Sequence, residues 1–192
     1  MTRTRVGVLI SGTGTNMKAL VAASHHADCP FEIICVVSNK ADAGGISWAL
    51  EQGLATHVIS HKDYATREAF DAAVDAYLQN QRLDVIACAG FMRIMTPVLI
   101  EPWAGRMLNI HPSLLPRYKG LHTHQRAIDA GDREAGCTVH VVTTELDDGP
   151  ILAQARVPVL ARDTPEKLAA RVLVEEHRIY PVALMEFCSS LK

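Results

Sequence analysis

Short apolar runs alternate with longer stretches of helical periodicity over the first 110 residues, and this alternation constrains the fold more than any other feature of the sequence. We expect strands at 6–10, 32–38, 56–59, 84–88 and 106–110. We expect helices at 15–27, 44–53 and 65–81, and a short connection with proline at 97–103. Alternating strands and helices form βαβ units around a parallel sheet. The sequence therefore predicts an α/β fold with a doubly wound, mostly parallel, Rossmann-like sheet.

The pattern changes after residue 110. A helix is expected near 122–130, followed by two strands at 136–143 and 150–158. Between these strands lies Leu146-Asp147-Asp148-Gly149-Pro150, a segment rich in turn-forming residues. Such a turn joins neighbouring antiparallel strands, so we expect a C-terminal antiparallel hairpin after the parallel part of the sheet.

A final long helix is predicted to begin at Thr164-Pro165-Glu166. Threonine is a good N-cap, and proline is favoured at the first helical position. The helix should reach about Leu184 or beyond, and Pro181 is expected to kink or interrupt it. No repeat, low-complexity segment or Gly/Ser/Pro-rich linker divides the chain, so we expect one domain, 1–192.

The composition excludes several classes of partner. A formal net charge of −2 argues against a nucleic-acid or anionic membrane partner. The longest apolar runs, such as Val85 to Ala89, are far shorter than a membrane helix requires. The five cysteines are scattered and include no C-x-x-C pair, which is typical of proteins in a reducing compartment. We therefore expect a cytoplasmic protein.

The loop after the first strand, Ser11-Gly12-Thr13-Gly14-Thr15-Asn16, runs directly into a predicted helix. Backbone N–H groups at a helix N-terminus bind phosphate, and the hydroxyls of this loop can add donors. The third glycine of the dinucleotide fingerprint is replaced by Met17, and no Gly-Lys-Ser/Thr of a Walker loop is present. The loop predicts a monophosphate site, and a plain glycine-containing turn is the alternative.

Polar side chains meet at the end of the fifth predicted strand. Asn109 and His111 are two residues apart, so they share one face at the carboxyl edge, where open α/β sheets bind ligands. An amide donor and a protonated imidazole together can hold an oxyanion and move its proton, as acyl transfer requires. The acidic turn can stabilise the imidazolium, and we favour Asp147 over Asp148 for this role. Alternatively, His111 only caps a strand end and the aspartates only form a turn.

Two other classes of function stay open on the residues alone. A zinc enzyme would combine His122 and His124 with His111 or His140, but no cysteine or carboxylate spacing completes the set, so no metal is expected. A small-ligand binding module is compatible with the fold. His140 stands in an apolar strand, where it either lines the cleft or is a satisfied core histidine.

Two motifs, Asn109-Ile110-His111-Pro112-Ser113-Leu114-Leu115-Pro116 and Leu146-Asp147-Asp148-Gly149-Pro150, together resemble the folate-dependent formyltransferases. The resemblance extends over nearly the whole chain, to the branch that acts on glycinamide ribonucleotide, through Ser11-Gly12-Thr13-Gly14-Thr15-Asn16, Ser38-Asn39-Lys40-Ala41-Asp42-Ala43, Ala89-Gly90-Phe91-Met92-Arg93-Ile94 and Gly120-Leu121-His122-Thr123-His124. It implies transfer of the formyl group of 10-formyltetrahydrofolate to a phosphorylated glycinamide, the third step of de novo purine biosynthesis.

The same resemblance implies a role for each site residue. The catalytic residues would be Asn109, His111 and Asp147. The substrate phosphate and ribose would be bound by Gly14, Thr15, Asn16 and Glu176. The folate would contact Arg67, Met92, Arg93, Ile94, Met95, Asn109, Thr143, Thr144, Glu145, Leu146 and Asp147. In this assignment the backbone of 92–95 binds the pterin ring, and Arg67 lies near the glutamate tail.

The resemblance also divides the chain into a phosphate-binding half, 1–105, and a catalytic and folate-binding half, 106–192. The implied partners are small molecules, with the protein a monomer or a homodimer. The phosphate loop has threonines where many relatives have Asn and Ser, and Lys119 replaces a common proline. A sister formyltransferase, or a formyltetrahydrofolate hydrolase with the same Asn/His/Asp site, is the enzymatic alternative.

Overall fold

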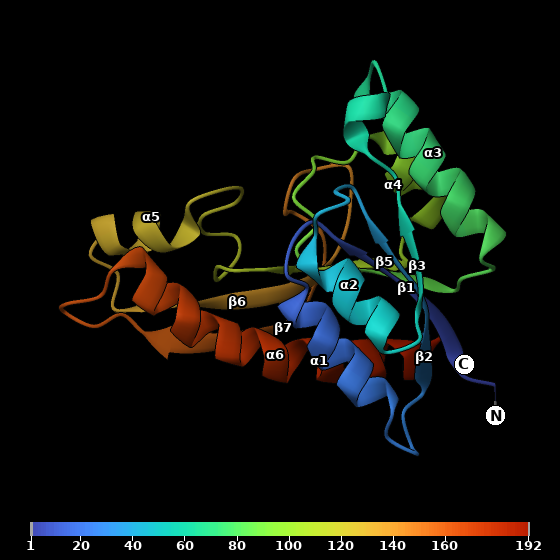
Figure 1. Cartoon of the computed structure of the whole chain (residues 1–192). Helices are drawn as coiled ribbons and strands as arrows, with labels where there is room; N and C mark the ends of the chain where they lie inside the picture. Colours follow the sequence, from blue (N-terminus) through green and yellow to red (C-terminus); the bar gives the residue numbers. More distant parts are fainter. Residues whose placement is uncertain (1, 192) are drawn as a thin grey trace.

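The computed structural model describes residues 2–191 and contains a seven-stranded sheet. Its strands are β1 (Thr4–Ile10), β2 (Phe31–Ser38), β3 (Ala55–Val58), β4 (Val85–Cys88), β5 (Met107–His111), β6 (Glu134–Val141) and β7 (Ile151–Pro158). The order across the sheet is β3-β2-β1-β4-β5-β6-β7. The first five strands pair in parallel, and β6 and β7 continue the sheet antiparallel (Figure 1). The predicted α/β class, parallel part and C-terminal hairpin are confirmed.

Helices cover both faces of the sheet because the strands are apolar on both sides. On one face lie α1 (Thr15–Ser24), α2 (Gly44–Glu51) and α6 (Pro165–Ser190), and on the other lie α3 (Arg67–Asn80), α4 (Pro97–Ile100) and the 3₁₀ turn η2 (Glu101–Trp103). Strand alternation divides β1 between the two cores, with Val6 and Val8 on the α6 side and Leu9 on the α3 side. A helix, α5 (Thr123–Asp129), follows β5, and a 3₁₀ turn, η1 (His61–Asp63), follows β3.

The final helix shows where packing overrides local preference. Of the two outcomes expected for Pro181, a kink or an interruption, the interruption is wrong, because α6 continues through Pro181 to Ser190. A proline inside a helix costs about 3 kcal/mol. Here Tyr180 before the proline and Ala183 and Leu184 after it are buried in the core, and this burial offsets the cost of the proline on both sides of it.

The sheet brings three chain segments to one edge. The chain passes from β1 to β2 on one side of β1 and later returns to β4 on its other side, which makes the β1/β4 boundary the topological switch point. Ligands bind at the carboxyl ends of strands at such a point. The backbone N–H of Ser11, directly after β1, donates to the carbonyl of Gly90, directly beyond β4. Asn109 and His111 end the next strand, β5.

Candidate active site

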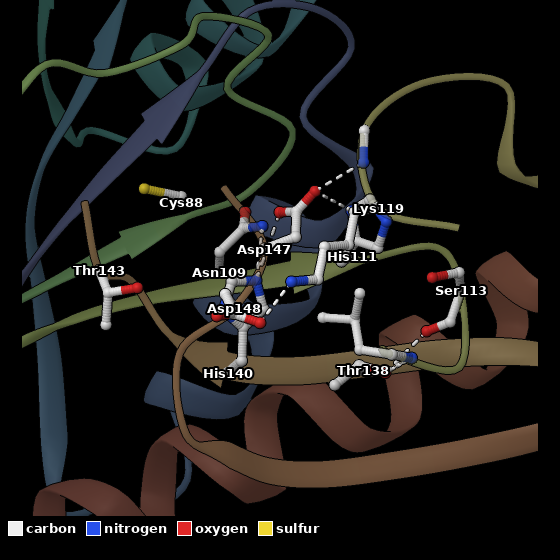
Figure 2. A network of polar contacts seen from close by, with 12 residues as sticks. Cys88, Asn109, His111, Ser113, Lys119, Thr138, His140, Thr143, Asp147 and Asp148 are labelled. Carbon is white, nitrogen blue, oxygen red and sulfur yellow. Dashed lines mark hydrogen bonds and ion pairs between the residues drawn. The ribbon is translucent and has the colours of Figure 1, made fainter. Parts of the chain in front are cut away.

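Four side chains meet at the carboxyl end of β5, as Figure 2 shows: Asn109, His111, His140 and Asp147. Asn109 and His111 come from β5, His140 comes from the neighbouring strand β6, and Asp147 comes from the loop between β6 and β7. Asp147 Oδ2 lies 3.4 Å from His111 Nδ1, and Asp147 Oδ1 lies 3.7 Å from His140 Nε2. The structure therefore brings together the three residues that the sequence singled out, with His140 as a fourth member.

The ring of His111 is surrounded by hydrogen-bond acceptors. Its Nε2 lies 3.0 Å from the carbonyl oxygen of Tyr118, and its Nδ1 faces the carboxylate of Asp147. A neutral imidazole carries only one N–H, whereas the imidazolium carries two. Because both nitrogens face acceptors, the doubly protonated ring satisfies this environment best. The geometry thus places both ring nitrogens of His111 against acceptors, one of them the carboxylate of Asp147.

Asp147 is fixed in place by the loops around it. Its Oδ2 accepts a hydrogen bond from the backbone N–H of Gly120, at 2.9 Å, and its side chain is 9% exposed. Asp147 adopts a left-handed backbone conformation, φ 49°, which is strained for a residue with a side chain. Asp148 instead points outward, with 53% of its side chain exposed, and pairs with Lys119. Of the two aspartates, only Asp147 faces His111.

His140 is held in one tautomer by its strand neighbours. Its Nδ1 donates to the carbonyl oxygen of Val141 at 3.0 Å, which leaves Nε2 as an acceptor 3.2 Å from Nδ2 of Asn109. Burial lowers the pKa of His140, and the attraction of Asp147 only partly offsets this effect. Asp147 therefore faces two histidines in different surroundings, His111 between two acceptors and His140 with a pKa lowered by burial. Such a difference is typical of acid–base assignments in enzymes.

The histidines considered for zinc have different surroundings. His124 is partly buried with its Nδ1 unpartnered, and burial lowers its pKa. His122 is exposed and adopts a left-handed conformation, φ 58°. Over residues 2–191, no three or more His, Cys, Asp or Glu side chains are arranged to hold a metal ion.

The glycine loop opens the N-terminus of α1 to an anion. Gly14 is the N-cap residue, with φ 68°, and has no side chain to cap the helix. A Cβ on Gly14 would lie 2.9 Å from Met17 Cε and 3.2 Å from the Cα of Gly45, so this position requires glycine. The first backbone N–H groups of α1 lack a side-chain cap, and its first turn contains no acidic residue. This geometry suits a phosphate.

Asn16 and Glu176 meet although 160 residues separate them. Asn16 Nδ2 donates to Glu176 Oε2 at 2.6 Å, and both residues are buried. Burial raises the pKa of Glu176, while the hydrogen bond from Asn16 acts in the opposite direction. The Oδ1 of Asn16 is buried without a partner among the described residues. Two polar side chains expected to contact the substrate are thus held together beside the glycine loop.

Ser11 corrects one expectation from the sequence. Its hydroxyl was expected to add a donor for phosphate, but it donates to Oδ1 of Asn39 at 2.5 Å and accepts from the backbone N–H of Met92 at 2.8 Å. Both of its hydrogen-bonding roles are therefore used inside the protein. Ser11 connects the glycine loop to the segment after β4.

The segment after β4 presents free backbone groups. Between residues 2 and 191, no hydrogen bond engages the backbone of Arg93, Ile94 or Met95. Met92 and Ile94 are 64% and 56% exposed. Unpaired donors and acceptors beside exposed apolar side chains suit a flat heterocyclic ligand. Arg67, at the start of α3, is exposed, and the structure does not join it to the catalytic group.

The loop from Thr143 to Asp147 lies between β6 and β7. Thr143 Oγ1 donates to the carbonyl of Glu145, whereas Thr144 and Glu145 are exposed and Leu146 is 53% exposed. Gly149 ends the loop, and a Cβ there would meet the carbonyl oxygen of Val141 at 1.8 Å. The tight closure at Gly149 helps to aim Asp147 toward β5.

A cavity of about 580 Å³ lies apart from these residues, on the hairpin. It is lined by Leu114, Leu115, Pro116, Arg117, Arg133, Glu134, Gln154 and Arg156. None of the predicted site residues contributes to it. The candidate active site is therefore identified by its polar side chains and not by this cavity.

The role of His140 was left open by the sequence, and Asn39 and the carbonyl of Tyr118 were not expected beside the site residues. For His140 a signal existed, since a histidine in an apolar strand beside a strand that carries Asn109 is a candidate register partner. Asn39 meets Ser11, which is 28 residues away in the chain, and the carbonyl of Tyr118 meets His111 only because the loop after β5 folds back. No local pattern marks them.

Comparison with known proteins identifies the relationship. The family model described as "Formyl transferase" matches residues 4–184. The phosphoribosylglycinamide formyltransferase of Haemophilus influenzae is 45% identical over 183 residues, which cover 95% of this chain and 86% of that protein. The trifunctional purine biosynthetic protein adenosine-3 of Chironomus tentans is 48% identical over 182 residues, 94% of this chain, but this chain spans only 13% of that protein's length.

Solved structures agree. The crystal structure of phosphoribosylglycinamide formyltransferase from Brucella melitensis superposes with a TM-score of 0.93 and 55% identity, covering 97% of this chain and 96% of that one. Glycinamide ribonucleotide transformylase 1 from Symbiobacterium toebii gives a TM-score of 0.95 and 43% identity, covering 98% of this chain and 89% of that one.

The described part of the chain, residues 2–191, contains no helix long and apolar enough to cross a membrane.

Proposed function

Because the chain belongs to the formyl transferase family, we propose that it transfers the formyl group of 10-formyltetrahydrofolate to the amine of phosphoribosylglycinamide, in de novo purine biosynthesis. The observation that carries this proposal is the convergence of Asn109, His111 and Asp147 at the carboxyl edge of the sheet. An amide and an imidazolium can stabilise the oxyanion that forms when an amine attacks a formyl group, and a carboxylate can orient the imidazolium.

The phosphorylated substrate binds at the N-terminal half of the chain. Its phosphate lies on the N-terminus of α1, where Gly14 and Thr15 present backbone N–H groups, and the helix dipole favours the negative charge. Asn16 and Glu176 contact the ribose from the buried pair that they form beside the loop. Ribose hydroxyls can supply the partner that Asn16 Oδ1 lacks.

The formyl donor binds between the segment 92–95 and the loop 143–147. The pterin ring pairs with the free backbone groups of Arg93, Ile94 and Met95, and the exposed side chains of Met92 and Leu146 cover its faces. Arg67 is available to the glutamate tail, because guanidinium groups pair well with carboxylates. This arrangement directs the formyl carbon toward Asn109.

The reaction proceeds by direct attack of the substrate's neutral amine on the formyl carbon. The carbonyl oxygen becomes an oxyanion, which Asn109 Nδ2 and the His111 imidazolium stabilise. Asp147 keeps His111 charged and oriented. The bond between the formyl carbon and N10 of the folate then breaks, the amine loses a proton, and N10 gains one. The products are the formylated amide and tetrahydrofolate.

One hydrogen bond must change during this cycle. His111 Nε2 faces the carbonyl of Tyr118, a residue with a left-handed backbone, φ 56°. A ring N–H bound to that carbonyl is not free to donate to an oxyanion. In this mechanism, ligand binding moves segment 118–122 and releases the N–H, in the way that loops complete many active sites on substrate binding.

The test is a spectrophotometric transfer assay with purified protein, 10-formyltetrahydrofolate and phosphoribosylglycinamide. Tetrahydrofolate should appear only when the amine is present, and the formylated product should be detected in equal amount. Glycinamide without the ribose phosphate should be a poor acceptor, because it cannot use the α1 site. Formate release without any amine would instead indicate a hydrolase and would overturn the proposal.

We also propose a cytoplasmic location and small-molecule partners only. The five cysteines are all buried, and the sequence contains no C-x-x-C pair, which is typical of a reducing compartment. The net charge of −2 provides no broad basic surface for a nucleic acid. The protein is proposed to act as a monomer or a homodimer, which size-exclusion chromatography with light scattering distinguishes.

A further inference from the structure

The segment after β4 is held at both ends and free in the middle. At its start, the backbone N–H of Met92 donates to Ser11 Oγ at 2.8 Å. At its end, the backbone N–H of Thr96 donates to Asp71 Oδ2 at 2.5 Å. Within the described chain, residues 2–191, the backbone of 93–95 between these two bonds makes no hydrogen bond. The conformation of these three residues therefore depends on the two anchors.

The anchor at Thr96 is a buried carboxylate from the helix α3. Asp71 is 1% exposed, and burial raises the pKa of its carboxyl, which the hydrogen bond from Thr96 and the charge of Arg93 oppose. A carboxylate that accepts a backbone N–H forms a charge-assisted hydrogen bond, about twice as strong as a neutral one. Burying a carboxylate on α3 costs free energy, and Oδ1 of Asp71 has no partner among the described residues. Helix stability does not explain its presence.

Arg93 connects this anchor to the middle of the segment. Its guanidinium lies over the ring of Phe70, 5.8 Å from the centroid, and Phe70 is the neighbour of Asp71 on α3. The Nε of Arg93 is buried without a partner within residues 2–191. Buried polar atoms on both Asp71 and Arg93 thus remain available to hydrogen-bond a ligand at this corner.

The anchor at Met92 is the hydroxyl of Ser11, in the glycine loop. Ser11 is 4% exposed, and its hydroxyl is oriented by the hydrogen bond that it donates to Oδ1 of Asn39. Asn39 is itself buried, and its Nδ2 lies 3.2 Å from His61 Nδ1. The hydroxyl therefore has one orientation in which it can accept from Met92.

We propose that Ser11 and Asp71 are positioning residues for the formyl donor, which clamp segment 92–96 so that the free backbone groups of 93–95 match the edge of the pterin ring. The inference rests on the proposed function, because it assigns this segment to the folate. Neither residue touches the reacting atoms. Their contribution is to present a preformed binding edge, which lowers the entropy lost on binding.

The experiment compares Ser11→Ala, Asp71→Asn and the double variant with a matched control, Asp75→Asn. Asp75 lies one turn further along α3, and its carboxylate accepts from Trp103 Nε1 at 2.7 Å rather than from the segment. Each clamp variant should raise KM for the formyl folate about tenfold, which corresponds to about 1.4 kcal/mol. Both kcat and KM for the phosphorylated amine should stay within about twofold of wild type, as should all constants of Asp75→Asn.

Hydrogen exchange provides a second readout that does not need activity. In the unliganded protein, the amides of 92–96 should exchange faster in Asp71→Asn than in wild type or Asp75→Asn. Because this measurement uses no folate, it tests the clamp even if the wild-type protein transfers no formyl group. That result would overturn the proposed function but not the clamp. If Asp71→Asn does not fold, Ser11→Ala carries the same test from the other end.

Three results would overturn the inference. The first is an unchanged KM for the formyl folate in both single variants. The second is a parallel loss of kcat and of affinity for both substrates, which indicates general structural damage. The third is identical exchange of 92–96 in Asp71→Asn and Asp75→Asn. The rise in KM for the formyl folate can be converted into a free energy for each variant. A free energy in the double variant that is smaller than the sum of the two single values supports a shared clamp.

Discussion

Asn109 and His140 face each other as register partners across the antiparallel pair β5 and β6, with Nδ2 of Asn109 3.2 Å from Nε2 of His140. The neutral His140 accepts one N–H of the Asn109 amide, because its Nδ1 already donates to Val141. The amide is thereby oriented, and its second N–H remains for the oxyanion. The strand register thus determines which way the amide donor points.

The first prediction concerns this pair. His140→Leu should lower kcat about tenfold to a hundredfold, less than removing an oxyanion donor outright, which costs about 10² to 10³. The KM for the phosphorylated amine should change little, because His140 acts through Asn109. Steady-state kinetics checks this, with His57→Leu as control, since His57 stacks on Tyr77 at 4.2 Å, away from the site. Unchanged kcat in His140→Leu would refute the orienting role.

The second prediction separates the two aspartates of the loop. Asp147→Asn should reduce kcat by about 10² or more, because it removes the charge that faces His111. Asp148→Asn should retain activity within about threefold, since Asp148 only forms a surface ion pair with Lys119, and such pairs contribute about 0–1 kcal/mol. Equal losses in the two variants would mean that Asp147 has no special function.

The third prediction concerns the glycine loop. Gly14→Ala should raise KM for the phosphorylated amine and destabilise the fold by about 1–3 kcal/mol, because the new methyl group meets Met17 and the backbone is left-handed. Gly53→Ala serves as control, since Gly53 has φ 74° but open space around its Cβ. It should lower stability without changing KM. Thermal unfolding and kinetics together distinguish strain from loss of the phosphate site.

The fourth prediction follows from the raised pKa of Glu176. Because burial raises this pKa in the folded state above its ordinary value of 4.5, the folded protein holds the proton more tightly than the unfolded chain does. The associated stability is therefore complete below pH 4.5 and is lost as pH rises through the folded-state pKa.

Glu176→Gln abolishes this titration. The variant should gain free energy of unfolding relative to wild type between pH 4 and pH 7, while its KM for the phosphorylated amine rises. Glu175→Gln is the control, since it only breaks a surface pair with Arg178. Chemical denaturation at several pH values measures the difference. If the difference in free energy of unfolding between Glu176→Gln and wild type became smaller with rising pH, the assignment would be contradicted.

The fifth prediction concerns the loops over the site. Segments 112–124 and 143–149 should become protected from hydrogen exchange when both ligands bind, because they flank the site and must rearrange around His111. The amide of Gly120, bound to Asp147, should change most within the first segment. Identical protection with and without ligands would argue against movement of the Tyr118 carbonyl.

The sequence alone indicated the order of strands and helices, the switch to an antiparallel hairpin and the glycine loop before α1. These features depend on residues close together in the chain, through apolar periodicity, turn-forming residues and capping. The pairing of Asn109 and His111 on one face is also local, because side chains two apart on a strand point the same way. The roles of Arg67 and Glu176 came only from the resemblance to a family.

Only the tertiary structure decided what depends on contacts between distant segments. It placed Asp147, which the sequence already favoured over Asp148, against His111, paired Asn16 with Glu176, and placed His140 against Asn109. It also turned the Ser11 hydroxyl away from the phosphate loop and carried α6 through Pro181. Strand register, crossover direction and burial determine such contacts, and none of these is encoded in the spacing of neighbouring residues.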